Sequence, residues 1–243
     1  MSYVLIIGAK SDIAKATARE YAKHGYDLYL AARNVEELGE FAQDVITRTQ
    51  KKVHLVELDI LDYTSHHDFY KNLKEKPLGV ISAIGYLGEQ ETAQDNFNET
   101  QRILDTNYTG IVSLFNIIAN DFEHRRSGFM VGISSVAGDR GRKSNYVYGS
   151  AKAAFTAYLS GLRNRLYDAQ VHVLTVKPGF VATKMTEDMD LPEKLTAKPE
   201  AVAEAIYKAQ QKNKNVLYTK WIWKWVMMII RNIPEFQFKK MSI

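Results

Sequence analysis

Short apolar runs alternate with amphipathic stretches along most of the chain. The first run, Tyr3 to Ile7, is continuously apolar, which is typical of a strand buried on both faces. Apolar residues at helical spacing follow at once in 15–22. The pattern then predicts strands at 27–31, 53–58, 79–83, 129–135, 171–176 and 216–219, and helices at 35–49, 65–74, 97–120, 148–162 and 199–211.

This alternation predicts an α/β fold, a single Rossmann-type doubly wound parallel sheet flanked by helices. Right-handed crossovers bring the carboxyl ends of parallel strands to one edge, where such folds bind ligands. Expected strands are followed by Gly8, Asp59, Gly85, Ser135 and the pair Pro178-Gly179. We therefore expect one ligand site at that edge of the sheet.

Length and composition limit the possible organisation. A chain of 243 residues with 46% hydrophobic content can form one domain with a substantial core, which we assign to residues 1–219. The absence of cysteine excludes disulfides and thiolate metal sites, and no His, Asp or Glu spacing suggests a metal. The first apolar run is too short for a signal peptide, so we expect a cytoplasmic protein.

Residues 220–243 form a tryptophan-rich basic tail. They hold all three tryptophans, five basic residues and one acid, and so carry the whole formal net charge of +4. The charge is therefore local and does not indicate a nucleic-acid partner. As a helix, the tail would be amphipathic and too short to span a bilayer. It could contact the inner face of an anionic membrane, the protein's own cleft or a partner subunit.

Ser135, Tyr148 and Lys152 are the candidate catalytic groups. Tyr148 and Lys152 lie four residues apart in an expected helix and so share a face, and Ser135 ends the preceding strand. A phenol titrates near pH ~10, and a neighbouring ammonium is expected to lower its pKa toward the range of efficient acid-base catalysis. The set can exchange a proton with a carbonyl or alcohol oxygen while a hydride moves, although Tyr-x-x-x-Lys alone is often a surface pair.

The loop after the first strand is a candidate pyrophosphate site. In dinucleotide folds, backbone N–H groups and a helix N-terminus face the pyrophosphate at this place. The candidate contacts are Gly8, Lys10, Ser11, Asp12 and Ile13. The glycine pattern is degraded, since Asp12 and Ala14 stand where glycines are expected. A carboxylate beside a pyrophosphate is unfavourable, so Asp12 is expected to cap the helix instead.

The end of the second strand indicates which cofactor binds. An acid at this position holds the ribose of NAD, whereas an arginine accommodates a 2′-phosphate. The chain has Arg33 and Asn34 here, without an acid, and Lys10 and Ser11 can assist. We therefore expect NADP(H) in preference to NAD(H). The alternative is that Arg33 is solvated and that an acid at 36 or 37 reaches back to the ribose.

With these features the chain resembles the classical short-chain dehydrogenase/reductase (SDR) family over nearly its whole length. Asn107, the Ser135-Tyr148-Lys152 spacing and Pro178-Gly179 with Thr183 occur in the family's order. The resemblance implies that Tyr148 donates or accepts the proton and that Ser135 orients the substrate oxygen. It implies that Lys152 lowers the tyrosine pKa and holds the nicotinamide ribose, and that Asn107 ties Lys152 to a water path.

The resemblance also implies further cofactor contacts and an assembly. Asp59 is expected at the adenine amino group with Ile60 beside it, and Val181 and Thr183 at the carboxamide. The other contacts implied along the cofactor edge are Ala83, Ile84, Gly85, Tyr148, Lys152, Pro178 and Gly179. Segment 82–85 departs from the usual Asn-Asn-Ala-Gly. A homodimer or homotetramer built on the two long helices is the implied assembly.

The catalytic neighbourhood and the tail look like a narrower group, the decaprenylphosphoryl-2-keto-erythropentose reductases and their relatives. That likeness implies a ketone linked through phosphate to a polyprenyl lipid. The loop between Ser135 and Tyr148 contains Arg140, Arg142 and Lys143, which either meet such a phosphodiester or form an exposed basic loop.

The sequence therefore predicts an NADPH-dependent carbonyl reductase, with Tyr148 as proton donor, acting on a small-molecule or lipid-linked ketone. The alternative is a non-catalytic NADP(H)-binding protein that uses its tail to sense redox state or recruit partners. The degraded glycine loop favours the alternative, and the complete Asn-Ser-Tyr-Lys set favours the reductase.

Overall fold

Parallel strands form the centre of the molecule in the spatial order β3-β2-β1-β4-β5-β6-β7. The computed structural model describes residues 2–187 and 190–241, to which all structural statements refer. The strands are β1 (Tyr3–Ile7), β2 (Asp27–Ala32), β3 (Val53–Glu57), β4 (Gly79–Ser82), β5 (Phe129–Ile133), β6 (His172–Pro178) and β7 (Val216–Thr219). Ile7 lies beside Ala31 on one side and Ser82 on the other. The strand order reverses at β1 and β4, so the predicted doubly wound sheet is confirmed.

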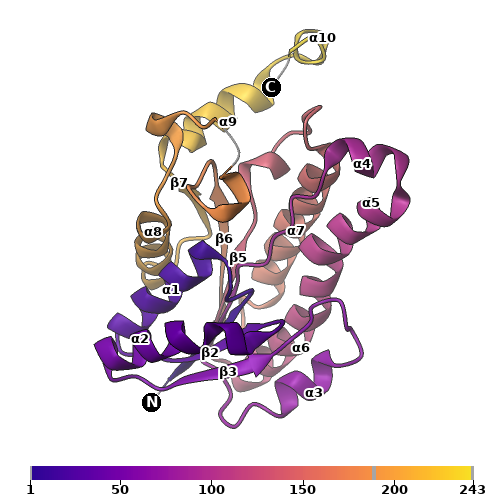
Figure 1. The fold of residues 1–243 in the computed structure, drawn as a ribbon. Helices are drawn as coiled ribbons and strands as arrows, with labels where there is room; N and C mark the ends of the chain where they lie inside the picture. The colour runs from indigo at the N-terminus through magenta and orange to yellow at the C-terminus, as the bar shows by residue number, and fades with distance from the viewer. Residues whose placement is uncertain (1, 188–189, 242–243) are drawn as a thin grey trace.

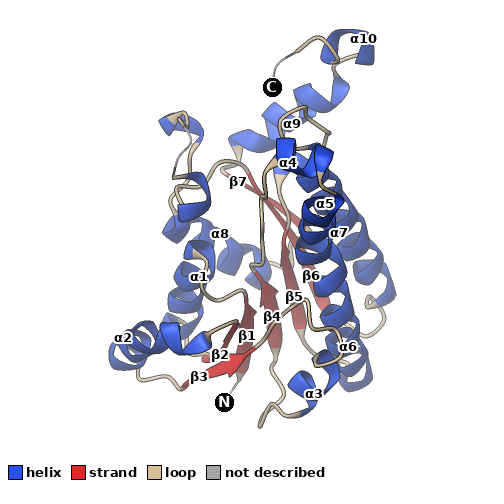
Figure 2. Cartoon of the chain, turned by 45° about the vertical axis from the view of Figure 1, so that its right-hand side comes forward, coloured by secondary structure: helices blue, strands red, loops and turns tan. Residues whose placement is uncertain are grey.

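Helices cover both faces of the sheet (Figures 1 and 2). One face carries α1 (Asp12–Lys23), α2 (Gly39–Thr49) and α8 (Pro199–Gln211). The other carries α3 (His66–Lys71), α4 (Gln90–Asp95), α5 (Phe97–Leu104), α6 (Gly110–Arg125) and α7 (Tyr146–Arg165). This arrangement buries both faces of the central strands, which explains why β1 is continuously apolar.

Two hydrophobic cores hold the layers together. Between the sheet and the long helices α6 and α7, the side chains of Phe115, Phe155 and Leu159 are fully buried. On the opposite face, Tyr21 of α1 and Ile206 of α8 pack against the sheet. Both cores lie below the carboxyl ends of the strands, so the edge itself remains available for a site.

The expected helix 97–120 is interrupted in the structure. A π-helical turn, η2 (Asp105–Thr109), separates α5 from α6. Its cause is the buried side chain of Asn107, whose amide donates to the carbonyl oxygens of Ile103 (2.8 Å) and Tyr86 (2.6 Å). A side chain that enters the backbone hydrogen-bond ladder locally widens the helix, and such turns are frequent at functional sites.

The tail forms α9 (Ile222–Asn232) and α10 (Glu235–Phe238) above the carboxyl ends of the strands (Figure 1). Trp223 and Met227 on its inner side are buried against Val136, with Phe180 and Leu195 alongside. The Trp223 indole Nε1 donates to the Leu195 carbonyl oxygen at 3.0 Å. One side of α9 therefore packs on the rest of the chain at this edge of the sheet. No helix in the described ranges is long and apolar enough to cross a membrane.

Candidate active site

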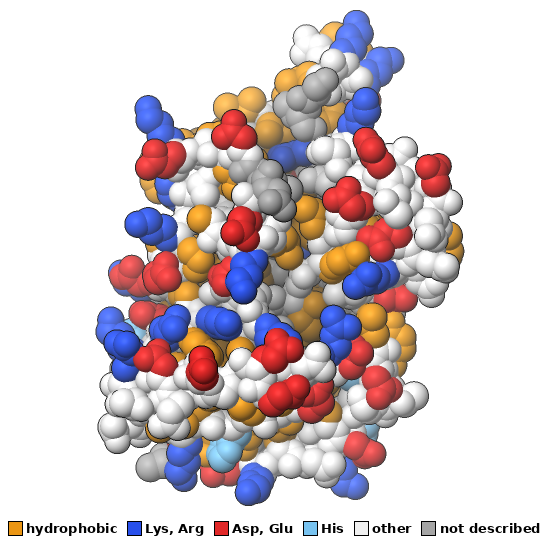
Figure 3. Space-filling view, viewed as in Figure 1, with side chains coloured by type: hydrophobic (Ala, Val, Ile, Leu, Met, Phe, Trp, Pro, Cys, Tyr) orange, Lys and Arg blue, Asp and Glu red, His pale blue; other side chains and the backbone are white. Residues whose placement is uncertain are grey.

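A cavity of about 770 Å³ opens at the carboxyl edge of the sheet, a volume typical of small-molecule sites. Figure 3 shows this face of the molecule hollowed near its centre, with a row of Lys and Arg side chains below the hollow. The predicted residues that line the cavity are Gly8, Lys10, Ser11, Asp12, Ile13, Arg33, Asn34, Asp59, Ile60, Ala83, Ile84, Gly85, Ser135, Tyr148, Lys152, Pro178, Gly179, Val181 and Thr183. Asn107 is the one predicted site residue that does not line the cavity.

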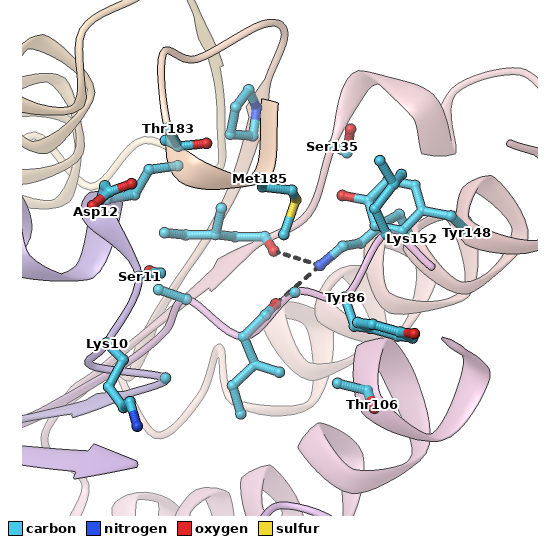
Figure 4. Close-up of a pocket in the computed structure, with 18 of the residues that line it drawn as sticks. Lys10, Ser11, Asp12, Tyr86, Thr106, Ser135, Tyr148, Lys152, Thr183 and Met185 are labelled. Carbon is cyan, nitrogen blue, oxygen red and sulfur yellow. Dashed lines mark hydrogen bonds between the residues drawn. The ribbon is translucent and has the colours of Figure 1, made fainter. Parts of the chain in front are cut away.

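Lys152 is a buried cation at the centre of the site (Figure 4). Its side chain comes from α7, and Nζ donates to the carbonyl oxygens of Ile84 (3.1 Å) and Ile133 (3.3 Å). These carbonyls end β5 and follow β4, so the lysine joins two strand ends. Burial disfavours the charged form and lowers the pKa of Lys152 to about 7.

Tyr148 lies in the first turn of α7, facing Ser135 across the cavity wall (Figure 4). Burial raises the pKa of the Tyr148 phenol to about 12, and a hydrogen bond with Ser135 opposes that shift. The expected lowering of this pKa is therefore wrong for the protein alone, because burial outweighs the influence of Lys152. The ammonium lies 5.7 Å from the centre of the phenol ring and is turned toward backbone carbonyls.

Asn107 contacts the backbone of Tyr86, a residue that lines the cavity. It is fully buried, and besides its two donated bonds its Oδ1 accepts from the Tyr86 amide at 3.2 Å. These contacts fix the segment after β4, whose Ile84 carbonyl receives the Lys152 ammonium. Asn107 therefore positions the lysine through the backbone between them.

Gly8 lets the first loop pack closely against the segment after β4 at the cavity wall. Its φ is +78°, and a Cβ there would lie 2.9 Å from the Ile84 amide nitrogen. Only glycine fits this close approach at a left-handed φ. The loop and the N-terminus of α1 thus form the open cradle that a pyrophosphate requires, so these residues fit a dinucleotide.

The predicted capping role of Asp12 is wrong. Ser11 has the extended backbone of an N-cap, and its Oγ accepts from the Ala14 amide at 3.1 Å. Asp12 is one residue too far along the helix, and its Oδ2 instead accepts from the Lys184 amide at 2.9 Å. The carboxylate therefore ties α1 to the loop after β6.

The cavity end near β2 is basic. Arg33 is exposed there, and Lys10 Nζ donates to the Arg33 carbonyl at 3.1 Å. Two of the nearby acids bind protein groups: Glu37 pairs with Lys10 at 2.7 Å, and Glu57 accepts from the amides of Asn34 and Val35. Glu36 is exposed.

The loop after β6 contributes residues that sequence reasoning missed. Met185 lines the cavity, and a Cβ at Gly85 would lie 3.3 Å from its Cε (Figure 4). Val181 pairs with Ala197 in an isolated bridge, and the Thr183 amide donates to Thr186 Oγ1 at 3.2 Å. The one sequence signal for Met185 was its place just after Thr183.

The three basic residues of the loop before α7 have different roles. Arg140 donates to the carbonyl oxygens of Ile230 (2.7 Å) and Ile233 (2.6 Å), pairs with Glu235 and lies 3.6 Å above the Phe238 ring. It therefore holds the end of α9, a role that neither of the two alternatives for this loop, phosphodiester contact or exposed basic loop, had included. Arg142 lines the cavity, whereas Lys143 is exposed outside it.

Three comparisons with known proteins bear on this site. A family profile described as short chain dehydrogenase matches residues 2–194. The chain is 35% identical to an uncharacterized oxidoreductase of Mycobacterium tuberculosis (strain H37Rv), covering 98% of this chain and 96% of the relative. It is 27% identical to an NADP-dependent 3-hydroxy acid dehydrogenase of Schizosaccharomyces pombe, covering 88% of each. A short-chain dehydrogenase from Sphingobium yanoikuyae, solved in complex with NADPH, has the same fold, with a TM-score of 0.85, 22% identity and 97% coverage of each chain.

Proposed function

The chain belongs to the short chain dehydrogenase family, whose NAD(P)-dependent oxidoreductases act on CH–OH and C=O groups, and we propose that it is an NADPH-dependent carbonyl reductase. The observation that carries this proposal is the meeting of Ser135, Tyr148 and Lys152 in one cavity with the Gly8 cradle. The cradle accepts the cofactor, and the three side chains lie at the opposite wall, where a ketone oxygen would be held.

The chemistry divides between the cofactor and this chain's residues. The nicotinamide, when bound, supplies the hydride that reduces the ketone carbon. Ser135 holds the carbonyl oxygen by a hydrogen bond, and Tyr148 gives that oxygen its proton. Because burial keeps the phenol protonated well above neutral pH, Tyr148 is in the donor state that reduction requires. In the reverse direction, oxidation, this phenol would first have to lose its proton.

The preference for NADPH is a proposal that Arg33 supports. A charge-assisted hydrogen bond to a 2′-phosphate contributes about 1.5–3 kcal/mol, roughly 10- to 100-fold in affinity. We expect kcat/KM to favour NADPH over NADH by at least about tenfold, and Arg33→Ala to remove most of that ratio. Lys212→Ala, an exposed lysine past α8, serves as the control. Equal or better use of NADH by the wild type would contradict the proposal.

We further propose that the substrate is a lipid-linked ketone. The protein would be cytoplasmic and would bind this ketone at the inner face of a membrane. The support is the outer side of α9, where Trp221, Trp225 and Ile229 are 73%, 51% and 63% exposed. Exposed Lys224 and Arg231 flank this apolar strip. An apolar face with tryptophans and adjacent basic residues suits an anionic lipid surface. A homodimer or homotetramer built on α6 and α7 is proposed as the assembly, and sedimentation equilibrium tests it.

A further inference from the structure

Arg142 is a half-buried cation in the cavity, and no carboxylate within residues 2–187 and 190–241 forms an ion pair with it. Its Nε is buried and has no hydrogen-bond partner among the residues that the structure describes. Its Nη2 donates to the Met227 sulfur of α9 at 3.4 Å, and a thioether is a weak acceptor.

Asp139, whose charge acts on Arg142, is already bound by other groups. Asp139 favours the charged form of Arg142 from a distance. Its own oxygens, however, are bound by Lys177 Nζ at 2.5 Å and by the Tyr218 hydroxyl at 2.7 Å. Burial accordingly lowers the pKa of the Arg142 guanidinium. A buried, unpaired cation is costly, and fold stability alone gives no reason to keep one at this position.

Arg140, two residues earlier, shows the contrast. It comes from the same loop, yet its guanidinium has carbonyl, carboxylate and aromatic partners in the tail. The loop is therefore able to satisfy an arginine with protein groups. Arg142 is left aimed into the cavity with its donors available.

A second polar group lies beside it. Asn145 lines the same cavity, and its Oδ1 is buried without a hydrogen-bond partner among the described residues. Asn145 immediately precedes α7 and lies three residues before Tyr148. Unpaired buried amide and guanidinium groups next to a catalytic phenol are typical of a subsite that a ligand completes.

The ligand group concerned belongs to the substrate. The loop with Arg142 follows β5, whereas the Gly8 cradle and Arg33 follow β1 and β2, on the far side of β4. The phosphates of a bound dinucleotide are thus served from the other end of the cavity. We propose that Arg142 binds an anionic carboxylate or phosphate group on the ketone that this enzyme reduces, while the Asn145 Oδ1 accepts a hydrogen bond from a donor group of the same ketone. This inference rests on the proposed reductase function.

The test compares ketones that differ in one charge. Acetoacetate is paired with methyl acetoacetate, and dihydroxyacetone phosphate with dihydroxyacetone. With NADPH, the ratio of kcat/KM for the anionic to the neutral member is expected to exceed one in at least one pair. A larger ratio for the acetoacetate pair would indicate a carboxylate, and a larger ratio for the dihydroxyacetone pair would indicate a phosphate.

Substitutions then assign the ratio to Arg142. Arg142→Gln is expected to lower it about 10- to 100-fold, the size of a charge-assisted hydrogen bond, while the Kd for NADPH stays unchanged. Arg142→Lys, which keeps the charge, is expected to retain part of the ratio. Lys143→Gln removes a neighbouring exposed charge and is expected to leave the ratio at the wild-type value.

Two results would overturn the inference: a wild-type ratio at or below one in both pairs, or a ratio that Arg142→Gln and Lys143→Gln change equally. The first needs only the wild type, so it decides even where a variant fails to fold. Reduction of the neutral ketones without any anionic preference defeats this inference alone. Absence of turnover on every ketone tested defeats the proposed function as well.

Discussion

At the scale of single residues, the site combines two side chains whose burial works against their charged forms. Lys152 is a cation held by two backbone carbonyls, and Tyr148 is a phenol kept protonated. Sequence reasoning identified both residues, because their spacing is local. It gave the wrong direction for the Tyr148 pKa, since burial depends on residues distant in the chain.

The buried lysine predicts a pH-dependent stability. Its pKa is about 7 in the folded protein and ~10.5 when unfolded. Below pH 7 Lys152 is protonated in both the folded and the unfolded protein, so the folded protein bears the full free-energy cost of burying the charge. Between pH ~7 and ~10.5 only the unfolded state keeps the proton, so stability rises with pH. The free energy of unfolding of the wild type, relative to Lys152→Met, should therefore rise by about 3 kcal/mol from pH 7 to pH 10.

Urea unfolding of the protein without cofactor, at several pH values, measures this difference. Lys212→Met replaces an exposed lysine and should show no such trend. A difference between wild type and Lys152→Met that stays constant with pH would contradict the assignment.

At the scale of elements, hydrophobic periodicity predicted the strands and most helices, because each element carries its own pattern. The missed features depend on contacts between distant segments. The π-turn at Asn107 requires the Tyr86 carbonyl, and Asp12 meets Lys184, 172 residues further on. Arg140 looks like a solvated charge until the end of α9 is placed against it. No local pattern signals any of these contacts.

The packing of α9 depends on Gly179, which directly follows β6. A Cβ at Gly179 would lie 2.0 Å from the Trp223 indole. Gly179→Ala should therefore displace Trp223 and destabilise the protein by about 2–4 kcal/mol. Gly161→Ala is the matched control, since a Cβ there meets nothing within 4 Å, and it should stabilise α7 by up to about 1 kcal/mol.

Urea unfolding and acrylamide quenching of tryptophan fluorescence measure both effects. Trp223 is the buried tryptophan at 3% exposure, so its displacement increases quenching. Wild-type stability and quenching in Gly179→Ala would show that α9 is not held by this contact.

At the scale of the whole molecule, the tail has two faces with different roles. Its inner face covers the catalytic edge of the sheet through Trp223 and Met227. Its outer face exposes Trp221, Trp225 and Ile229, and Figure 3 shows hydrophobic and basic side chains together near the top of the molecule. The sequence left packing and membrane contact as alternatives. The inner face packs on the protein, and the proposed membrane contact belongs to the outer face.

This division sharpens the vesicle experiment. Removing the whole tail would also uncover the core, so we choose substitutions on the outer face. Combined replacement of Trp221, Trp225 and Ile229 by serine should weaken sedimentation with phosphatidylglycerol vesicles by at least about tenfold. Phe97→Ser, which changes an exposed aromatic residue of α5, serves as the control. Equal vesicle binding by the wild type and the triple variant would end the membrane proposal.

We propose that Tyr148 donates the proton in an NADPH-dependent reduction. The most direct measurement is Tyr148→Phe, with kcat on a panel of ketones and the Kd for NADPH determined on the same preparation. The phenyl ring keeps the packing and removes the proton, so kcat should fall by about 100-fold or more while the Kd for NADPH stays within about twofold. Wild-type turnover by Tyr148→Phe would contradict the account.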